Sequence, residues 1–157
     1  MFAFPDDFEW LYPWTPIPDD YTLLTSIYDG ALTNGNHETG EVFVCARETL
    51  VAELKRELPP GHLLEGLEFQ AVGIYQGSHK DFVFATNDPH RPIACVHLTF
   101  VKESQPPAPS TSVFATLSEW REEMQRDHFN YPLHRGPIGL MRRFARRLLR
   151  FFHASHG

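Results

Sequence analysis

The spacing of apolar residues changes from a helical period to a strand period near residue 60. Between Glu48 and Leu58, four apolar side chains recur at helical spacing, and the four charged side chains between them are predicted to face water (Leu50, Val51, Leu54 and Leu58; Glu53, Lys55, Arg56 and Glu57). Pro59-Pro60-Gly61 ends this predicted helix. From 67 to 76 the period is two, which predicts a β-strand.

Two more apolar runs follow at short intervals and predict two more strands. The runs cover 81–86 (DFVFAT) and 92–101 (PIACVHLTFV), with turn residues at 77–78 and 87–89. Connections this short cannot hold a parallel crossover, so the strands are predicted to form an antiparallel meander. A Pro/Ser-rich stretch at 104–112 is interpreted as a linker.

Two helices are predicted in the last third of the chain. Ser118 is expected to cap a helix over 119–129, which Asn130-Tyr131-Pro132 ends. A final amphipathic helix is expected over 137–153, where apolar side chains occupy one half of the helical wheel and five arginines the other.

The first forty-six residues give weaker signals. Residues 1–20 are rich in aromatic side chains and broken by prolines, which predicts an extended segment. Asp20 is expected to cap a short helix over 21–28, and 41–46 is either a strand or the lead-in to the next helix. The fold class that follows is α+β: an antiparallel meander of three or more strands, with helices packed on one face and a C-terminal amphipathic helix.

Length and composition favour a single domain. The chain has 157 residues, and we expect one α+β domain over 1–134 with a basic helical tail over 135–157. No apolar run approaches the roughly 18 residues of a membrane span. The first residues lack the basic region of a secretory signal. With only two cysteines, Cys45 and Cys95, a cytoplasmic location is the simplest expectation.

Charge is distributed unevenly along the chain. Residues 1–41 carry eight acidic side chains and no Lys or Arg, whereas 135–157 carry six arginines and no acid, within a net charge of −6. This asymmetry indicates that the two ends contact each other or that each contacts a different partner. Nucleic acid is a disfavoured partner because the chain before the tail is strongly acidic.

Three short motifs resemble an uncharacterised family of small bacterial proteins. They are ELPPGH at 57–62, KDFVFAT at 80–86 and VHLTF at 96–100; the predicted helix that ends in MQRDHFNY at 124–131 also matches, so the similarity extends over 57–131. The family pattern more often has two acids before the second motif, and a Trp in place of Phe100. No activity is established for the family, so the resemblance implies a compact fold and a bacterial cytosol, and no chemistry.

Residues that could carry chemistry are few. His62, His97 and His128, with Asp127, offer metal-ligand types but no helical ligand spacing. Cys95 and His97 lie two apart on one predicted strand, which places both on one face as a nucleophile pair, although a buried structural cysteine is the commoner outcome. An enzyme or metal-binding protein using these histidines is therefore one alternative.

The preferred interpretation is a non-enzymatic protein that binds another protein, as an inhibitor or toxin-neutralising immunity protein does. Its acids would complement a basic toxin or enzyme, and its aromatic residues would anchor the contact. No cofactor is expected, and a homodimer is left open. A peripheral membrane or scaffold role of the 137–153 helix is a further alternative, with membrane contact not favoured. The expected binding residues are Asp6, Asp7, Glu9, Trp10, Tyr12, Trp14, Asp19, Asp20, Arg142, Arg143, Arg146 and Arg147.

Overall fold

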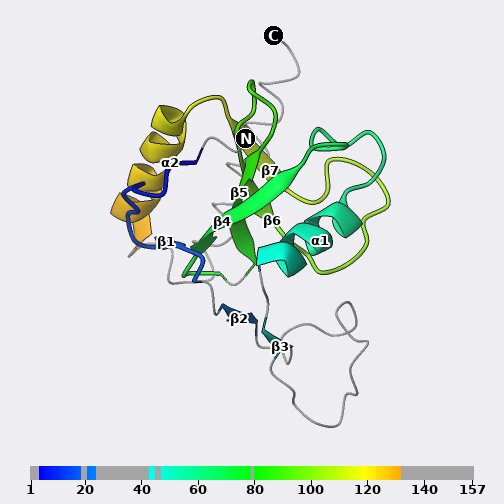
Figure 1. The fold of residues 1–157 in the computed structure, drawn as a ribbon, viewed down its shortest axis with the longest axis horizontal. Helices are drawn as coiled ribbons and strands as arrows, with labels where there is room; N and C mark the ends of the chain where they lie inside the picture. Colours follow the sequence, from blue (N-terminus) through cyan, green and yellow to red (C-terminus); the bar gives the residue numbers. More distant parts are fainter. Residues whose placement is uncertain (1–3, 19–20, 24–42, 45–46, 79, 132–157) are drawn as a thin grey trace.

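The computed structural model describes residues 4–18, 21–23, 43–44, 47–78 and 80–131 (Figure 1). The elements in chain order are β1 (Trp14–Pro16), β2 (Thr22–Leu23), β3 (Phe43–Val44), α1 (Arg47–Glu57), β4 (Phe69–Tyr75), β5 (Asp81–Thr86), β6 (Ile93–His97), β7 (Thr111–Phe114) and α2 (Leu117–Asn130). Strands β2 and β3 form a separate two-stranded pair.

The main sheet has five strands in the order β1-β4-β5-β6-β7, and every neighbouring pair is antiparallel. Strands β4 to β7 follow one another as a meander, and β1 returns to the other edge of β4. The α+β fold class with an antiparallel meander is therefore confirmed. Helix α1 and strand β5 have nearly the predicted bounds.

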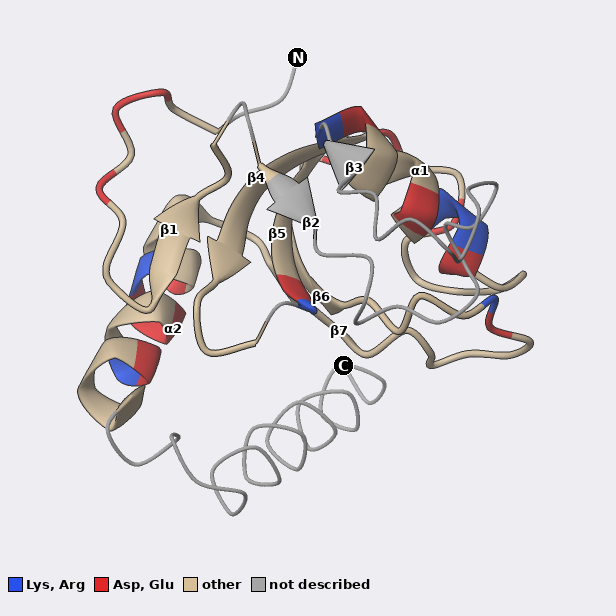
Figure 2. Cartoon of the chain, turned by 90° about the horizontal axis from the view of Figure 1, so that it is seen from below, with Lys and Arg blue, Asp and Glu red and all other residues tan. Residues whose placement is uncertain are grey.

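The two helices lie over opposite faces of the sheet, not over one face as expected (Figure 2). Phe82 and Phe84 of β5 pack in one core with Leu50 and Leu54 of α1. Val83, between them, packs in a second core that holds the α2 residues Trp120 and Met124. Successive strand residues point to opposite faces, so β5 serves both cores and is buried at all six positions. A strand buried on both faces needs a cover on each side.

A register shift in β4 changes which of its residues share a face. The pairing with β5 is irregular between Ala71 and Gly73, and as a result Ala71 and Ile74 both belong to the α1 core. Tyr75 belongs to the α2 core. A β-bulge inserts one extra residue into the strand, so the side chains beyond the bulge alternate between the two faces of the sheet in the opposite phase. This places Gly73 and Tyr75 toward the N-terminal segment and α2.

Three boundary predictions were wrong. Residues 111–114 form strand β7, although the stretch 104–112 was expected to be a linker. Thr22 and Leu23 form β2, where a helix over 21–28 was expected. Thr116, and not Ser118, caps α2: its side chain accepts a hydrogen bond from the Glu119 amide. The Glu119 carboxylate in turn accepts from the Ala115 amide at 2.8 Å, so the two side chains fix the start of the helix together.

Several predictions lie outside the described residues. They include the rest of the 21–28 helix, Cys45 and the amphipathic helix over 137–153. Of 41–46, only Phe43–Val44 is described, as a strand. In the part of the chain that the structure describes, no helix combines the length and apolar character needed to cross a bilayer.

Candidate functional site

The acidic and aromatic N-terminal segment, residues 4–18, packs along α2. The indole Nε1 of Trp14 donates a hydrogen bond to Oδ2 of Asp127 at 2.8 Å. Nδ1 of His128 donates to the carbonyl oxygen of Tyr12 at 2.6 Å, and the hydroxyls of Tyr12 and Tyr131 lie 3.0 Å apart. These bonds join the first described segment to the last, so an extended chain without helix is held in one position.

Aromatic packing fixes the same segment from beneath. The ring of Trp14 lies 4.9 Å from that of Tyr75 and 5.0 Å from that of Trp120, both edge-on. The ring of Trp10 passes directly over Gly73 of β4, where even a Cβ atom would collide with it. Glycine at this position therefore gives Trp10 its place on the sheet.

The outer side of this segment carries acidic side chains and the exposed Tyr12, and the neighbouring end of α2 carries an exposed phenylalanine. Asp6, Asp7 and Glu9 are exposed, and Tyr12 keeps 49% of its surface accessible. Phe129, next to the His128 that bonds Tyr12, is 80% exposed. We name these five residues the acidic–aromatic surface.

Acidic side chains outnumber basic ones around the acidic–aromatic surface. Residues 4–18 together with α2 hold seven acidic side chains against two arginines, Arg121 and Arg126. Both arginines are already engaged: Arg121 lies over the ring of Phe8, and Arg126 pairs with Glu123 at 2.5 Å. In Figure 2 the red stretches that mark Asp and Glu lie along the N-terminal segment and on α2 beside it.

The structure places the predicted binding residues unequally. Trp14 is 1% exposed, in the protein's own core, so we withdraw it from the proposed contact surface. Trp10 is half-buried and packs on Phe4, Phe8 and Trp120. Six of the twelve predicted residues lie outside the described residues: Asp19, Asp20, Arg142, Arg143, Arg146 and Arg147.

The three candidate histidines occupy three separate environments. His62 is buried after α1, where its Nδ1 accepts from the Leu64 amide and its Nε2 faces the Pro109 carbonyl at 3.3 Å. His97 on β6 pairs with the buried Asp81 of β5 at 3.1 Å, and His128 bonds Tyr12 from α2. Within the described ranges, no group of three or more His, Cys, Asp or Glu side chains is arranged to hold a metal ion. The shared metal site at these histidines is thus not formed.

The nucleophile pair of Cys95 and His97 also finds no support. Cys95 is 2% exposed and packs in the α2 core, as a small apolar residue does. The His97 ring pairs with the Asp81 carboxylate. A thiol this deep in the core is inaccessible to a substrate.

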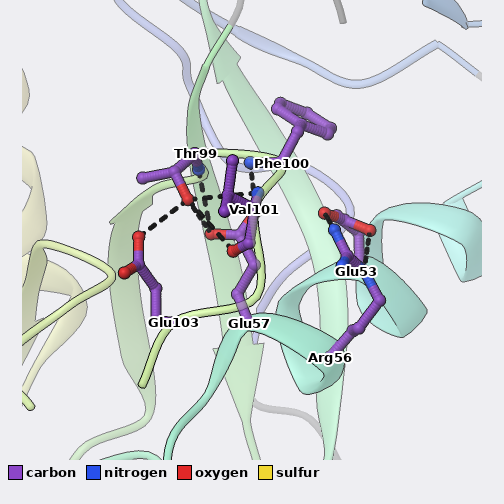
Figure 3. Close-up of polar contacts among 7 residues, drawn as sticks. All are labelled: Glu53, Arg56, Glu57, Thr99, Phe100, Val101 and Glu103. Atoms are coloured by element: carbon purple, nitrogen blue, oxygen red, sulfur yellow. Dashed lines mark hydrogen bonds and ion pairs between the residues drawn. The ribbon is translucent and has the colours of Figure 1, made fainter. Parts of the chain in front are cut away.

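Sequence reasoning missed a buried acidic cluster at the end of α1 (Figure 3). Glu53 and Glu57, expected to face water, are 3% and 0% exposed. Glu53 receives two hydrogen bonds from Arg56, at 2.9 and 2.5 Å. Glu57 reaches across to the segment after β6, where it accepts from the amide of Thr99 at 2.9 Å, the hydroxyl of Thr99 at 3.0 Å and the amide of Phe100.

Burial changes the protonation of Glu57. Loss of solvent raises the pKa of Glu57 from 4.5 to about 7. Hydrogen bonds from the Thr99 and Phe100 amides and the Thr99 hydroxyl lower the pKa, and the neighbouring Glu53 carboxyl raises it. Glu57 therefore holds a proton over a pH range in which ordinary glutamates are ionised.

Comparison with known proteins yields no relative. No family model, no curated protein and no solved structure matches the chain. The resemblance to a bacterial family therefore stays a prediction, and the function has to be argued from the described residues.

Proposed function

We propose that this protein binds another protein through the acidic–aromatic surface, and that the partner presents a basic cleft or patch. The observation that carries the proposal is the fixed N-terminal segment, which points Asp6, Asp7, Glu9 and Tyr12 to solvent while its other aromatic residues hold it in place. An inhibitor or toxin-neutralising immunity protein of a basic enzyme is the function this surface fits best. A cytoplasmic location in a bacterium is part of the same proposal.

The charge of the surface favours fast association. Like-signed carboxylates close together extend an attractive field toward a cationic partner and raise the association rate, most strongly at low salt. Tyr12 and Phe129 supply the apolar area that electrostatic attraction alone does not provide. Because the segment is already ordered on α2, little conformational freedom remains to be lost on binding.

The test begins with cross-linking from the surface itself. A photo-crosslinking amino acid at Tyr12 should capture a basic protein from host lysate, and the same group at Val101 should not, although Val101 is 59% exposed. Equal capture from both positions contradicts the assignment of the surface.

Association of the captured, purified protein then tests the charges. The variant combining Asp6→Asn, Asp7→Asn and Glu9→Gln should associate at least tenfold more slowly at low salt and show a flatter salt dependence. The matched control combines Glu48→Gln, Glu65→Gln and Glu68→Gln, which removes the same charge from exposed positions on and just after α1. If both variants slow association equally, net charge and not this surface governs binding.

A further inference from the structure

The hydrogen bonds around Thr99 cannot all form without an additional proton. Oγ1 of Thr99 lies 3.0 Å from Oε2 of Glu57 and 2.9 Å from Oε1 of Glu103, and the carbonyl of Val101 is a third acceptor at 3.3 Å. A hydroxyl has one proton and can donate to only one of them. If both carboxyl groups were ionised, one carboxylate oxygen would face the lone pairs of Thr99 without a proton between them.

The neighbouring charges do not supply that proton. On α1, Glu53 and Arg56 face Glu57, and Arg56 is committed to both oxygens of Glu53. From the segment after β6, the groups around Glu57 are the Thr99 and Phe100 amides, the Thr99 hydroxyl and, beyond it, Glu103. The described groups thus comprise three carboxyls and one guanidinium, and both of the hydrogen bonds that Arg56 makes here go to Glu53 (Figure 3).

We propose that Glu57, Thr99 and Glu103 share one proton in a chain, and that this proton latches residues 99–103 onto α1. The buried Glu57 donates to the Thr99 hydroxyl, and the hydroxyl donates to the half-exposed side chain of Glu103. All three groups are then satisfied with no second proton. Glu57 bridges sequence separations of 42 and 43 residues, so the latch joins parts of the chain that are distant in sequence.

Residues 99–103 include a backbone conformation that is unfavourable unless the surrounding structure fixes it. Phe100 has a φ of 60°, in the left-handed region that residues other than glycine seldom adopt, and its ring is buried in the α1 core. Its amide donates to Glu57. The next residue, Val101, is 59% exposed. Release of Glu57 would therefore free a strained turn that carries both a buried and an exposed apolar side chain.

The pH dependence follows from linkage. Glu57 has a pKa of about 7 when latched and an ordinary value near 4.5 when the segment is open. The raised value means that the latch is fully formed below pH 4.5 and loses strength as the pH rises to about 7. Opening should increase about tenfold per pH unit in this window and level off above it.

A carboxyl titration tests whether the proton is shared. The side-chain carbon resonance of Glu57, followed by NMR, should titrate near pH 7 in the full-length protein. Glu103→Gln supplies an amide that donates to Thr99, which frees the hydroxyl for an ionised Glu57, so the pKa should fall by about one unit. In the Thr99→Val background the same Glu103→Gln change should have little effect, because the hydroxyl link is absent.

Two outcomes would contradict the shared proton. A shift of equal size in both backgrounds means that Glu103 acts through space, and the shared proton is then wrong. A Glu57 titration near pH 4.5 in the wild-type protein also overturns the proposal, and it needs no variant to fold.

Amide hydrogen exchange tests the latch itself. After division by the intrinsic exchange rates of an unstructured chain, the rates of the Thr99 and Phe100 amides should rise about tenfold for each pH unit between 5 and 7. Glu57→Gln, which keeps the shape of the protonated side chain, should abolish this increase, and Glu48→Gln on the exposed face of α1 should preserve it. Exchange that follows the intrinsic rates at every pH shows that the proton does not control the segment.

Discussion

The indole of Trp14 and the carboxylate of Asp127 form a hydrogen bond of 2.8 Å across 113 residues of sequence. Trp14 is 1% exposed in the core beneath α2, whereas Asp127 is half-buried on the helix. The bond therefore aligns an edge strand with α2 and positions the acidic–aromatic surface that lies above both.

Breaking this bond should loosen the N-terminal segment before it unfolds the protein. We expect Trp14→Phe and Asp127→Ala each to destabilise the protein, with a coupling free energy of about 1–2 kcal/mol between them, because a hydrogen bond to a charged group is worth roughly 1.5–3 kcal/mol. Urea unfolding of both single variants and the double variant measures the coupling. Purely additive effects would mean that the bond contributes nothing beyond packing.

Gly73→Ala tests whether the packing of Trp10 against β4 requires glycine at position 73. The added methyl group would collide with the far edge of the indole, so the ring has to move away from β4. We expect a loss of about 1–3 kcal/mol, typical of overpacking, and altered tryptophan fluorescence. Combining the change with Trp10→Leu, which shortens the side chain, should recover part of the loss. Undiminished stability of Gly73→Ala would show that Trp10 has another low-energy position.

Local patterns were sufficient to predict the strands β4, β5 and β6 of the meander. The bounds of β5 follow from a six-residue apolar run between two turns. The same run also contained a signal against one-sided packing, since it is apolar at nearly every position and not at alternate ones. The sequence of β7 did not predict a strand, because its four residues follow directly on a Pro-rich stretch. Pairing with the edge of β6 defines this strand.

The buried acidic cluster is a case in which residue type leads to a wrong prediction of exposure. Leu50, Glu53, Leu54 and Glu57 have the spacing of one helical face, and all four are buried. Because glutamate is rarely buried, its place on that face was interpreted as exposure. The groups that make its burial tolerable, the amides of Thr99 and Phe100, lie more than forty residues away, and no helical pattern reveals them.

The start of α2 offers a sharp test of helix capping. The sequence T-x-x-E at 116–119 is the signature of a capping box, and the structure forms a variant of it in which the Glu119 carboxylate accepts from the Ala115 amide. We expect Thr116→Ala to cost about 1 kcal/mol in thermal or urea unfolding, and Ser118→Ala to cost almost nothing, since Ser118 is exposed past the cap. Equal costs for the two substitutions would contradict the assignment of the cap.

His62 should make stability fall in mild acid. Burial lowers the pKa of His62 below 6.5, and the Pro109 and Pro107 carbonyls and Glu65 only partly oppose this effect. The neutral ring is required because its Nδ1 accepts a hydrogen bond from the Leu64 amide, which a protonated ring cannot do. The unfolded chain therefore binds the proton more tightly, and the stabilising contribution of His62, complete above pH 6.5, is lost as the pH falls through the folded-state pKa.

Glu57 has the opposite dependence in this range, so the wild-type curve alone does not isolate His62. His62→Gln offers both an acceptor for Leu64 and a donor for Pro109 without titrating. The unfolding free energy of the wild type minus that of His62→Gln should be constant above pH 7 and decrease steadily below pH 6.5, and a difference that stays flat to pH 5 would show that His62 accepts its proton without loss of the fold.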